Sequence, residues 1–203
     1  MKLYEYEAFP NPKRVRMFLA EKGIDVERIQ VNVPAGEHRT PVYIVKNPDA
    51  TVPFLELDDG SIVSGCVAIS RYFEDGTTGN SLMGDTPEAA ANITMWQRRM
   101  EAGLLDAGTT YFHHATDGLG AIEPYQIKEW GEKNGERVKA TADQLESQLE
   151  GQAFVAGDSF SIADITAFVG YGFAKYVGLI DGGDTPNVDR WFAAVSERAS
   201  AAA

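Results

Sequence analysis

NPDATVPFLELDDGSIVSGCVAISRYF, residues 47–73, contains the pattern that decides the fold. Val52 and Pro53 lead into a short apolar strand, and an Asp-Asp-Gly turn at 58–60 joins it to a second strand. A helix that begins at Gly65 follows. A valine before a proline in this position can leave its backbone N–H and C=O unpaired in the sheet. Such a strand edge beside a helix N-terminus suits a short, extended, anionic peptide.

The first 77 residues alternate between strand and helix patterns. Asn11 and Pro12 form a helix start, with Asn as the N-cap and Pro at the first helical position, and Gly23 ends that helix. A polar loop at 34–40 follows the second strand. The resulting βαβαββα order predicts an α/β thioredoxin-like N-terminal domain over residues 1–77. Its expected strands are 2–6, 26–33, 54–57 and 61–63, and its expected helices after the first are 41–46 and 65–73.

The rest of the chain has a helical period. Residues 78–87 are rich in Gly, Thr, Asn and Pro and predict a linker, and residues 88–203 predict an all-α C-terminal helical domain. Ser161 and Asp164 form a capping box before an apolar helix, and Pro186 starts the last helix. The residues expected to face inward are Ile93, Trp96, Met100, Leu104 and Tyr111 on a long helix that starts at Thr86, Val138, Leu145 and Leu149 on a helix at 126–149, and Trp191, Phe192 and Val195 on the last helix.

Composition and charge restrict the class of protein. The chain of 203 residues is 44% hydrophobic and 24% charged, and no apolar run reaches the roughly 18 residues that a membrane span needs. The net charge is −12, with 9 Lys and Arg against 12 Asp and Glu in residues 1–77, and 9 against 18 in residues 78–203. This charge argues against nucleic acid and anionic membrane as partners. A single cysteine and the lack of a signal-peptide pattern indicate a cytoplasmic location.

Six stretches carry a resemblance to a known family. They are GEHRTP (36–41), TVPFLELDDG (51–60), CVAISRYF (66–73), YFHHATDGLG (111–120), KEWG (128–131) and VAGDSFSIADITA (155–167). In this order and spacing, the chain resembles a cytosolic glutathione transferase along nearly its whole length. The fourth and fifth stretches resemble a fungal and bacterial subgroup, the GTT type, whose members lack the usual Tyr, Ser or Cys at the activating position.

The resemblance implies a glutathione transferase that acts in detoxification. It implies a homodimer in which glutathione, the co-substrate, binds at the N-terminal domain and a small hydrophobic electrophile binds against the helical one. The thiolate would attack an electrophilic carbon or, in a glutathione-dependent peroxidase, reduce a peroxide. A thiol has a pKa of about 8.5, and lowering it by about two units takes roughly 2.7 kcal/mol of preferential thiolate stabilisation. Three His and one Cys show no metal-ligand spacing, so we expect no metal.

The resemblance also implies which residues bind glutathione. His38 and Arg39 correspond to the basic pair that meets the glycine carboxylate, although taken alone they would be solvated loop charges. The backbone of Val52 would pair with the cysteinyl residue. The Val52–Pro53 peptide bond is predicted to be cis.

The γ-glutamyl end of the expected site departs from the family. Where relatives have Glu-Ser, this chain has Gly65-Cys66. The backbone N–H of Cys66 still suits a carboxylate, and its thiol is either a weak donor or a small buried hydrophobe. Gly65 cannot pair with the ligand's ammonium, which weakens binding by about ten- to a hundred-fold unless solvent or an acid replaces the missing side chain. Glu101 of the partner subunit is the candidate acid.

The usual activating residue is absent. Phe9 stands where many relatives carry Ser, and Asn11 either donates through its amide or serves only as an N-cap. In the resembled subgroup, a water held by a hydroxyl residue and a histidine replaces the missing group. Thr109 and His113, spaced i, i+4, match that pattern. Alternatively, His113 and His114 cap a helix end, and we expect His114 to be structural because it points elsewhere.

The electrophile site and the activity admit other interpretations. Phe9 and Tyr111, with Phe112 and Trp130, are candidates for an apolar pocket, but aromatic residues at helical spacing are also typical of a core. The missing groups at Phe9 and Gly65 are compatible with a non-catalytic binding or interaction protein on the same fold. A thiol–disulfide oxidoreductase is disfavoured, because no Cys-x-x-Cys follows the first strand.

Overall fold

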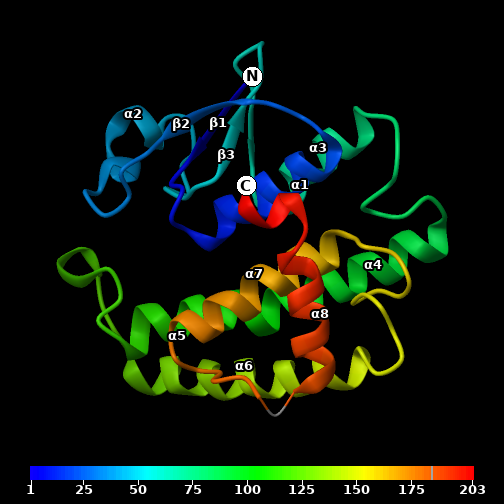
Figure 1. Ribbon diagram of the computed structural model, residues 1–203. Helices are drawn as coiled ribbons and strands as arrows, with labels where there is room; N and C mark the ends of the chain where they lie inside the picture. Colours follow the sequence, from blue (N-terminus) through cyan, green and yellow to red (C-terminus); the bar gives the residue numbers. More distant parts are fainter. Residues whose placement is uncertain (184) are drawn as a thin grey trace. The chain divides into compact units, whose positions relative to one another are not determined.

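The computed structural model describes residues 1–183 and 185–203. The chain divides into two compact units, Met1–Asn80 together with Ala202–Ala203, and Ser81–Ala201 (Figure 1). The first unit contains a sheet with helices, and the described part of the second is built from helices joined by loops. The predicted fold class, a thioredoxin-like α/β domain followed by a helical one, is therefore confirmed.

A mixed four-stranded sheet forms the centre of the first unit. The elements of this unit are β1 (Lys2–Glu5), α1 (Pro10–Lys22), β2 (Glu27–Gln30), the 3-10 helix η1 (Glu37–Arg39), α2 (Pro41–Ile44), β3 (Phe54–Glu56), β4 (Ile62–Ser64) and α3 (Cys66–Asp75). The strand order is β2-β1-β3-β4, in which β1 is parallel to β2, and β3 is antiparallel to both β1 and β4. This is the predicted βαβαββα order, with η1 inside the loop expected at 34–40.

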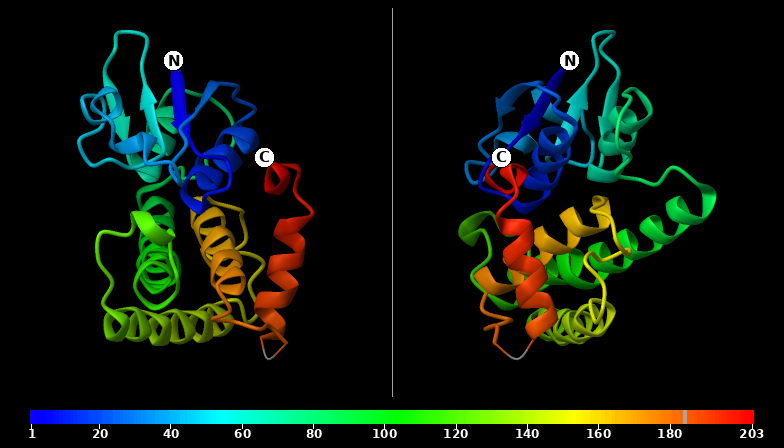
Figure 2. Two further views of the ribbon diagram at one scale, coloured as in Figure 1. Left: turned by 90° about the vertical axis from the view of Figure 1, so that its left-hand side faces the viewer. Right: turned by 45° about the vertical axis from the view of Figure 1, so that its right-hand side comes forward.

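Alternation along the strands produces two apolar faces of the sheet. On one face the rings of Tyr4 and Phe54 stack with their centroids 4.5 Å apart, and Tyr43 of α2 meets Tyr4 edge-on at 6.1 Å. Leu3 and Leu55 are fully buried on the other face, which α1 and α3 cover (Figure 1 and Figure 2). Helices therefore cover both faces, and the strand ends and loops remain available for a site.

The first helix begins earlier than predicted. It starts at Pro10, and Phe9 occupies the N-cap position without any side-chain cap hydrogen bond. Asn11 is therefore a first-turn residue and not the predicted N-cap, because Pro10 already supplies the fixed φ of a first helical position. Gly23 ends the helix as predicted, in the left-handed conformation with a φ of 65°.

From residue 87 onward, the regular elements of the described chain are helices. The elements are α4 (Pro87–Met100), the π-helical turn η2 (Glu101–Leu105), α5 (Asp106–Ala115), the 3-10 helix η3 (Gly120–Ile122), α6 (Lys128–Gln148), α7 (Ile162–Tyr176), α8 (Pro186–Ser196) and the 3-10 helix η4 (Ala199–Ala202). The first three form one long helix that changes type twice. α5 packs against α6, and α7 packs against both α4 and η2 (Figure 2).

Most of the predicted inward-facing residues are buried. On the long helix, Trp96, Met100 and Leu104 are buried, whereas Ile93 and Tyr111 are half-buried. On the later helices, Phe192 is half-buried, and the buried residues are Val138, Leu145, Leu149, Trp191 and Val195. All residues of 109–116 are half-buried. The side chains of the C-terminal turns of α5 are therefore partly exposed to solvent.

A buried carboxylate joins three segments of the second unit. The predicted capping box at the start of α7 is present, with Ser161 and Asp164 bonded reciprocally. The carboxylate of Asp164 is fully buried and also accepts hydrogen bonds from the Val155 N–H (2.8 Å) and the Trp191 indole N–H (2.9 Å). Burial raises the pKa of Asp164 from 3.8 to about 6, although these donors favour its charged form. One side chain therefore ties α7 to α8 and to the preceding loop.

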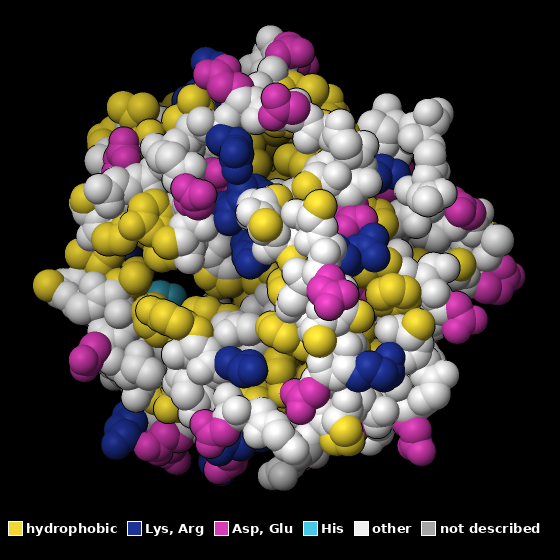
Figure 3. Space-filling view, viewed as in Figure 1, with side chains coloured by type: hydrophobic (Ala, Val, Ile, Leu, Met, Phe, Trp, Pro, Cys, Tyr) yellow, Lys and Arg dark blue, Asp and Glu magenta, His cyan; other side chains and the backbone are white. Residues whose placement is uncertain are grey.

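The surface carries both signs of charge. On the face drawn in Figure 3, Asp and Glu side chains are interspersed with Lys and Arg side chains and with hydrophobic ones. None of the described helices combines the length and the apolar character that a membrane span requires.

We expect Asp164→Ala to lower the free energy of unfolding by about 3–5 kcal/mol, because it leaves the buried donors of Val155, Ser161 and Trp191 without an acceptor. Trp191→Phe is the matched control, since it removes one donor and keeps the carboxylate bonded. It should cost about 1–2 kcal/mol. Urea unfolding at one fixed protein concentration measures both changes. Equal destabilisation by the two variants would contradict the role of the carboxylate.

The raised pKa of Asp164 also predicts a pH dependence of stability. The folded protein binds this proton more tightly than the unfolded chain, whose Asp pKa is about 3.9, so the group favours folding below about pH 4, and that contribution is lost as the pH rises through about 6. The stability advantage of the natural chain over Asp164→Asn should therefore shrink by about 2–3 kcal/mol between pH 4 and pH 7. Urea midpoints across this range provide the measurement, and a constant difference would refute the prediction.

Candidate functional site

The strand edge predicted at Val52 is present in the first unit. The Val52–Pro53 peptide bond is cis, as predicted, and β3 begins at the next residue. Among the described residues, neither the backbone N–H nor the backbone C=O of Val52 has a hydrogen-bond partner. Because Phe54 pairs with Ser64, the antiparallel register continues to Val52 and Cys66, which brings this edge beside the start of α3. An extended peptide can supply the two missing partners.

The loop that presents Val52 is held by Asn47, which sequence reasoning missed. Asn47 is buried, and its side-chain amide donates to Thr51 O (2.9 Å) and to Thr51 Oγ1 (3.2 Å). Its backbone N–H donates to Tyr43 O at the end of the preceding helical turn (2.8 Å). An Asn directly before Pro48 is a turn signal, and it could have identified this residue from the sequence.

The η1 turn places His38 and Arg39 in different environments. His38 is only 6% exposed, and its Nδ1 has no hydrogen-bond partner among the described residues. Burial, and then the nearby Arg39, lowers the pKa of His38 below its ordinary value of 6.5. At neutral pH the exposed Arg39 therefore carries the positive charge, and His38 is a neutral hydrogen-bonding group. His38 therefore differs from both expectations for the pair, because it is buried and neutral and not a second positive charge or a solvated loop residue.

Glu37 holds the η1 turn in place and was also missed from the sequence. Its carboxylate accepts hydrogen bonds from the Asn32 N–H (2.6 Å) and from the Tyr43 hydroxyl (3.1 Å). These bonds connect the segment after β2 to α2 and close the loop between them. The position of Glu37 directly before the His-Arg pair in GEHRTP was the one signal in the sequence that could have identified it. Its hydrogen-bond partners, however, are set by the fold.

The N-terminus of α3 has no side-chain cap. The helix begins at Cys66, one residue later than predicted, and Gly65 occupies the N-cap position with a φ of 88° and a ψ of 127°. Residues with a side chain rarely adopt this backbone, yet a Cβ added at Gly65 would meet nothing within 4 Å. The glycine is therefore required by the backbone conformation and not by crowding. The first N–H groups of α3 can bind an anion.

Asn11 links the start of α1 to the start of α3. Its Oδ1 accepts a hydrogen bond from Arg14 Nη1 (3.0 Å), and its backbone oxygen accepts one from the buried Cys66 thiol (3.4 Å). In the part of the chain that the structure describes, the Nδ2 donors of Asn11 have no partner. The Phe9 ring packs edge-on against Tyr6 at 4.9 Å and offers no donor. Asn11 therefore retains an amide donor at this position.

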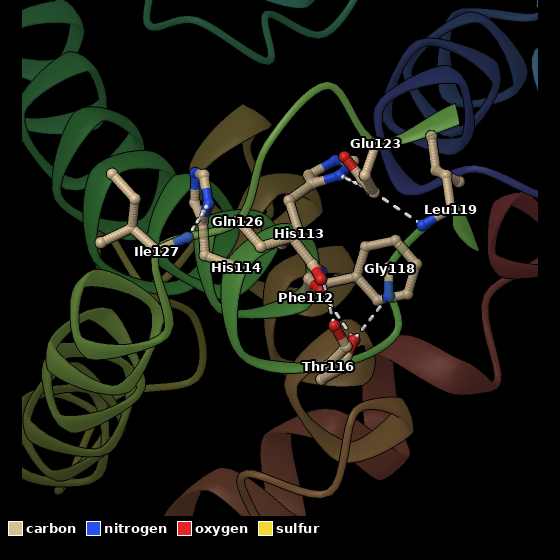
Figure 4. Close-up of polar contacts among 9 residues, drawn as sticks. All are labelled: Phe112, His113, His114, Thr116, Gly118, Leu119, Glu123, Gln126 and Ile127. Carbon is tan, nitrogen blue, oxygen red and sulfur yellow. Dashed lines mark hydrogen bonds and ion pairs between the residues drawn. The ribbon is translucent and has the colours of Figure 1, made fainter. Parts of the chain in front are cut away.

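Thr109 and His113 lie one turn apart on α5 in the second unit. Thr109 Oγ1 donates to the Asp106 carbonyl oxygen (3.0 Å). His113 Nδ1 lies 2.6 Å from Glu123 Oε1, and the same oxygen accepts a hydrogen bond from the Leu119 N–H (2.8 Å) (Figure 4). Sequence reasoning missed Glu123, because a loop acid ten residues after a histidine carries no periodic signal.

His114, the next residue, contacts a different partner. Its Nδ1 accepts a hydrogen bond from the Ile127 N–H (3.2 Å), and Ile127 is the N-cap of α6 (Figure 4). Its ring lies 5.5 Å from the ring of Tyr125. His114 therefore holds the start of α6 against the end of α5, which agrees with its expected structural role.

The remaining predicted site residues differ in their surroundings. The side chain of Glu101 is 20% exposed and accepts a hydrogen bond from Arg98 Nη1 (3.3 Å). Tyr111 is half-buried on α5, and Trp130 is 55% exposed on α6. The Phe112 ring meets Phe173 of α7 at 5.9 Å and so contributes to packing within the second unit.

Metal ligands do not gather in the described structure. Over residues 1–183 and 185–203, no group of three or more His, Cys, Asp or Glu side chains is placed to hold a metal ion.

Two family models match this chain. The glutathione S-transferase N-terminal domain matches residues 10–75, and the glutathione S-transferase C-terminal domain matches residues 104–199. Glutathione S-transferase 2 of Saccharomyces cerevisiae is 40% identical over 205 residues, which cover 98% of this chain and 87% of that protein.

Solved structures give the same result. A glutathione S-transferase domain-containing protein of Marinobacter aquaeolei is 45% identical with a TM-score of 0.96, over 98% of this chain and 99% of its own. Gtt2 from Saccharomyces cerevisiae is 39% identical with a TM-score of 0.95, over 98% of each chain. A class Gtt2 glutathione S-transferase of Vibrio parahaemolyticus is 34% identical with a TM-score of 0.84, over 98% of this chain and 94% of its own. The predicted resemblance, including that to GTT-type proteins, is confirmed, and the chain belongs to the glutathione S-transferase family of enzymes.

Proposed function

We propose that this protein conjugates glutathione to a small hydrophobic electrophile, by attack of the glutathione thiolate on an electrophilic carbon. The observation that carries the proposal is the unpaired backbone of Val52, in a chain of this family, beside an uncapped helix N-terminus. Glutathione is a short anionic tripeptide with an extended backbone. It can therefore use the strand edge and the helix N-terminus together.

The two ends of the tripeptide have different partners in this proposal. The Val52 backbone pairs with the cysteinyl residue, and the γ-glutamyl carboxylate binds at the Cys66 N–H. The glycine carboxylate binds Arg39 through charge and His38 through a neutral hydrogen bond. The exposed position of Arg39 directly after His38 in η1 supports this placement, because the guanidinium is open to a ligand carboxylate.

The γ-glutamyl ammonium has no acidic partner at Gly65. We assign this role to Glu101 of the partner subunit in a homodimer. The partial exposure of the Glu101 side chain, at 20%, supports the assignment, because a carboxylate must reach the surface to meet a ligand of another subunit. A homodimer of this kind would complete a site that one subunit leaves without its acid.

Thiol activation in this proposal comes from a water held by Thr109 and His113. The Asn11 amide is a second donor to the thiolate, and Phe9 supplies none. Lowering the thiol pKa by about two units takes roughly 2.7 kcal/mol. One or two hydrogen bonds to a charged group, at about 1.5–3 kcal/mol each, are sufficient.

The electrophile is hydrophobic in this proposal because its site is assigned to aromatic residues. Phe9 and Tyr111 are both half-buried and can present a ring face to an apolar substrate. A cytoplasmic location fits the proposal, since the cytoplasm keeps both glutathione and the single Cys66 reduced.

Turnover of chlorodinitrobenzene with and without glutathione tests the activity, and isothermal titration tests binding. The proposal requires conjugation that disappears when glutathione is omitted. Binding without turnover of this or other electrophiles would favour a non-catalytic protein on the same fold. No binding at millimolar glutathione would overturn the proposal altogether.

Arg39→Ala should weaken glutathione binding about tenfold, because it removes the charge opposite the glycine carboxylate. The same substitution should leave the affinity for glutathione with an amidated glycine unchanged, since that ligand lacks the carboxylate. Arg28→Ala is the control, because Arg28 is an exposed arginine on β2 of the same unit. Isothermal titration with both ligands measures the effect, and an equal loss for the two ligands would contradict the assignment.

His113→Ala should lower kcat/KM for conjugation by about 100-fold or more, because positioned acid–base groups contribute about 10²–10⁴-fold. Glutathione affinity should stay within about twofold, since His113 is assigned to the thiol and not to the binding groups. His114→Gln is the matched control on the adjacent residue and should retain most of the activity. Undiminished conjugation by His113→Ala would exclude this mechanism of activation.

A further inference from the structure

The loop between α5 and α6 folds back over the last turn of α5. Gln126 Nε2 donates to His113 O (2.8 Å) and to Thr116 O (2.7 Å). Thr116 Oγ1 donates to Phe112 O (2.6 Å) and accepts from the Gly118 N–H (3.0 Å) (Figure 4). These contacts fix the loop mainly through backbone groups, and one of its two acidic residues, Glu123, meets the His113 ring.

Glu123 is built into this loop. Its side chain is 9% exposed and accepts a hydrogen bond from the Leu119 N–H. A Cβ added at Gly118, where φ is 54°, would lie 2.5 Å from Glu123 Oε1, so a side chain at this position would push the carboxylate away from its present place. Burial by itself raises the pKa of Glu123, but the hydrogen bonds from Leu119 and His113 outweigh it, and this pKa lies below its ordinary 4.5. At neutral pH the group is an ionised acceptor.

The two adjacent histidines are held in opposite tautomers. An ionised carboxylate only accepts, so His113 Nδ1 carries the proton that lies toward Glu123. The backbone N–H of Ile127 only donates, so His114 Nδ1 carries none. Neutral His113 therefore has its lone pair on Nε2, and no described residue forms a hydrogen bond to that atom.

Thr109 would meet the water of the proposed function as a hydrogen-bond acceptor. Its hydroxyl hydrogen is donated to Asp106 O, which leaves its oxygen lone pairs. A water between Thr109 Oγ1 and His113 Nε2 would donate one hydrogen to each of them, because both atoms offer lone pairs. Its own lone pairs then remain to accept the hydrogen of a thiol. This pattern makes the water a proton carrier toward His113.

We propose that Glu123 is a positioning residue that makes His113 the base of a proton relay from the glutathione thiol. The proposal rests on the proposed function above. In the relay the S–H bond breaks and its proton passes to the water oxygen. At the same time one O–H bond of the water breaks, and its proton passes to His113 Nε2. The S–H electron pair stays on sulfur as thiolate, and the Glu123 carboxylate stabilises the resulting imidazolium.

The tautomer of His113 is the first test, because it needs no turnover. ¹⁵N NMR at neutral pH should show a protonated Nδ1 and an unprotonated Nε2 for His113 in the natural chain. In Glu123→Ala the proton should move in large part to Nε2, while His114 should keep its own tautomer. An Nε2-protonated His113 in the natural chain, or no change in Glu123→Ala, would overturn the proposal.

Conjugation kinetics form the second test. Glu123→Ala should lower kcat/KM about tenfold to a hundredfold, and Glu123→Gln, which keeps an oxygen acceptor without the charge, should recover part of that loss. In a His113→Ala background the same Glu123→Ala change should have little further effect, because the two residues act as one unit. A full additional loss in that background would mean that Glu123 acts independently of His113 and would overturn the proposal.

Thr116→Val is the matched control for the loop. It removes the Thr116 hydroxyl bonds to Phe112 and Gly118 but leaves the carboxylate–imidazole contact. It should keep near-natural activity, and a loss equal to that of Glu123→Ala would assign the effect to loop geometry and overturn the proposal. If His113→Ala alone retains full activity, the proposed activation fails, and the tautomer measurement still decides whether Glu123 orients His113.

Discussion

The buried carboxylate of Asp164 is the interaction on which the helical unit depends. It receives donors from the cap of α7, from the loop before it and from α8, so three segments share one acceptor. α7 in turn packs against α4 and η2, and Gly170 allows an approach so close that an added Cβ would lie 2.9 Å from Leu104 Cβ. The long helix that carries Thr109 and His113 is therefore supported by a helix whose own position depends on this carboxylate.

The first unit relies on backbone groups at its candidate binding edge. Val52 contributes an unpaired N–H and C=O, and the start of α3 contributes N–H groups that no side chain caps. Side chains act mainly to hold these groups, as the buried amide of Asn47 does for the loop before Val52 and Glu37 does for the η1 turn. This binding edge can therefore persist although Gly65 lacks the side chain that the family pattern has at this position.

Identical side chains have different roles here because their partners differ. His113 faces a carboxylate and His114 faces a backbone N–H, so neighbouring residues are held in opposite tautomers. His38 is buried beside Arg39, and burial lowers its pKa, so it acts as a neutral group. The loop that folds back over α5 decides the first two cases, and the η1 turn decides the third.

The sequence by itself determined the order of elements and the family, because apolar periodicity, turn residues and ordered motifs are local signals. It predicted the βαβαββα unit and the capping box at Ser161 from neighbouring residues alone, and the cis bond before Pro53 through the family resemblance. It misplaced the cap of α1, since two prolines close together each satisfy the rule for a first helical position. Only the tertiary structure decided the burial of His38 and the contact of His113 with Glu123. Both depend on loops that fold back onto other segments, and hydrogen bonds between segments leave no periodic trace in the chain.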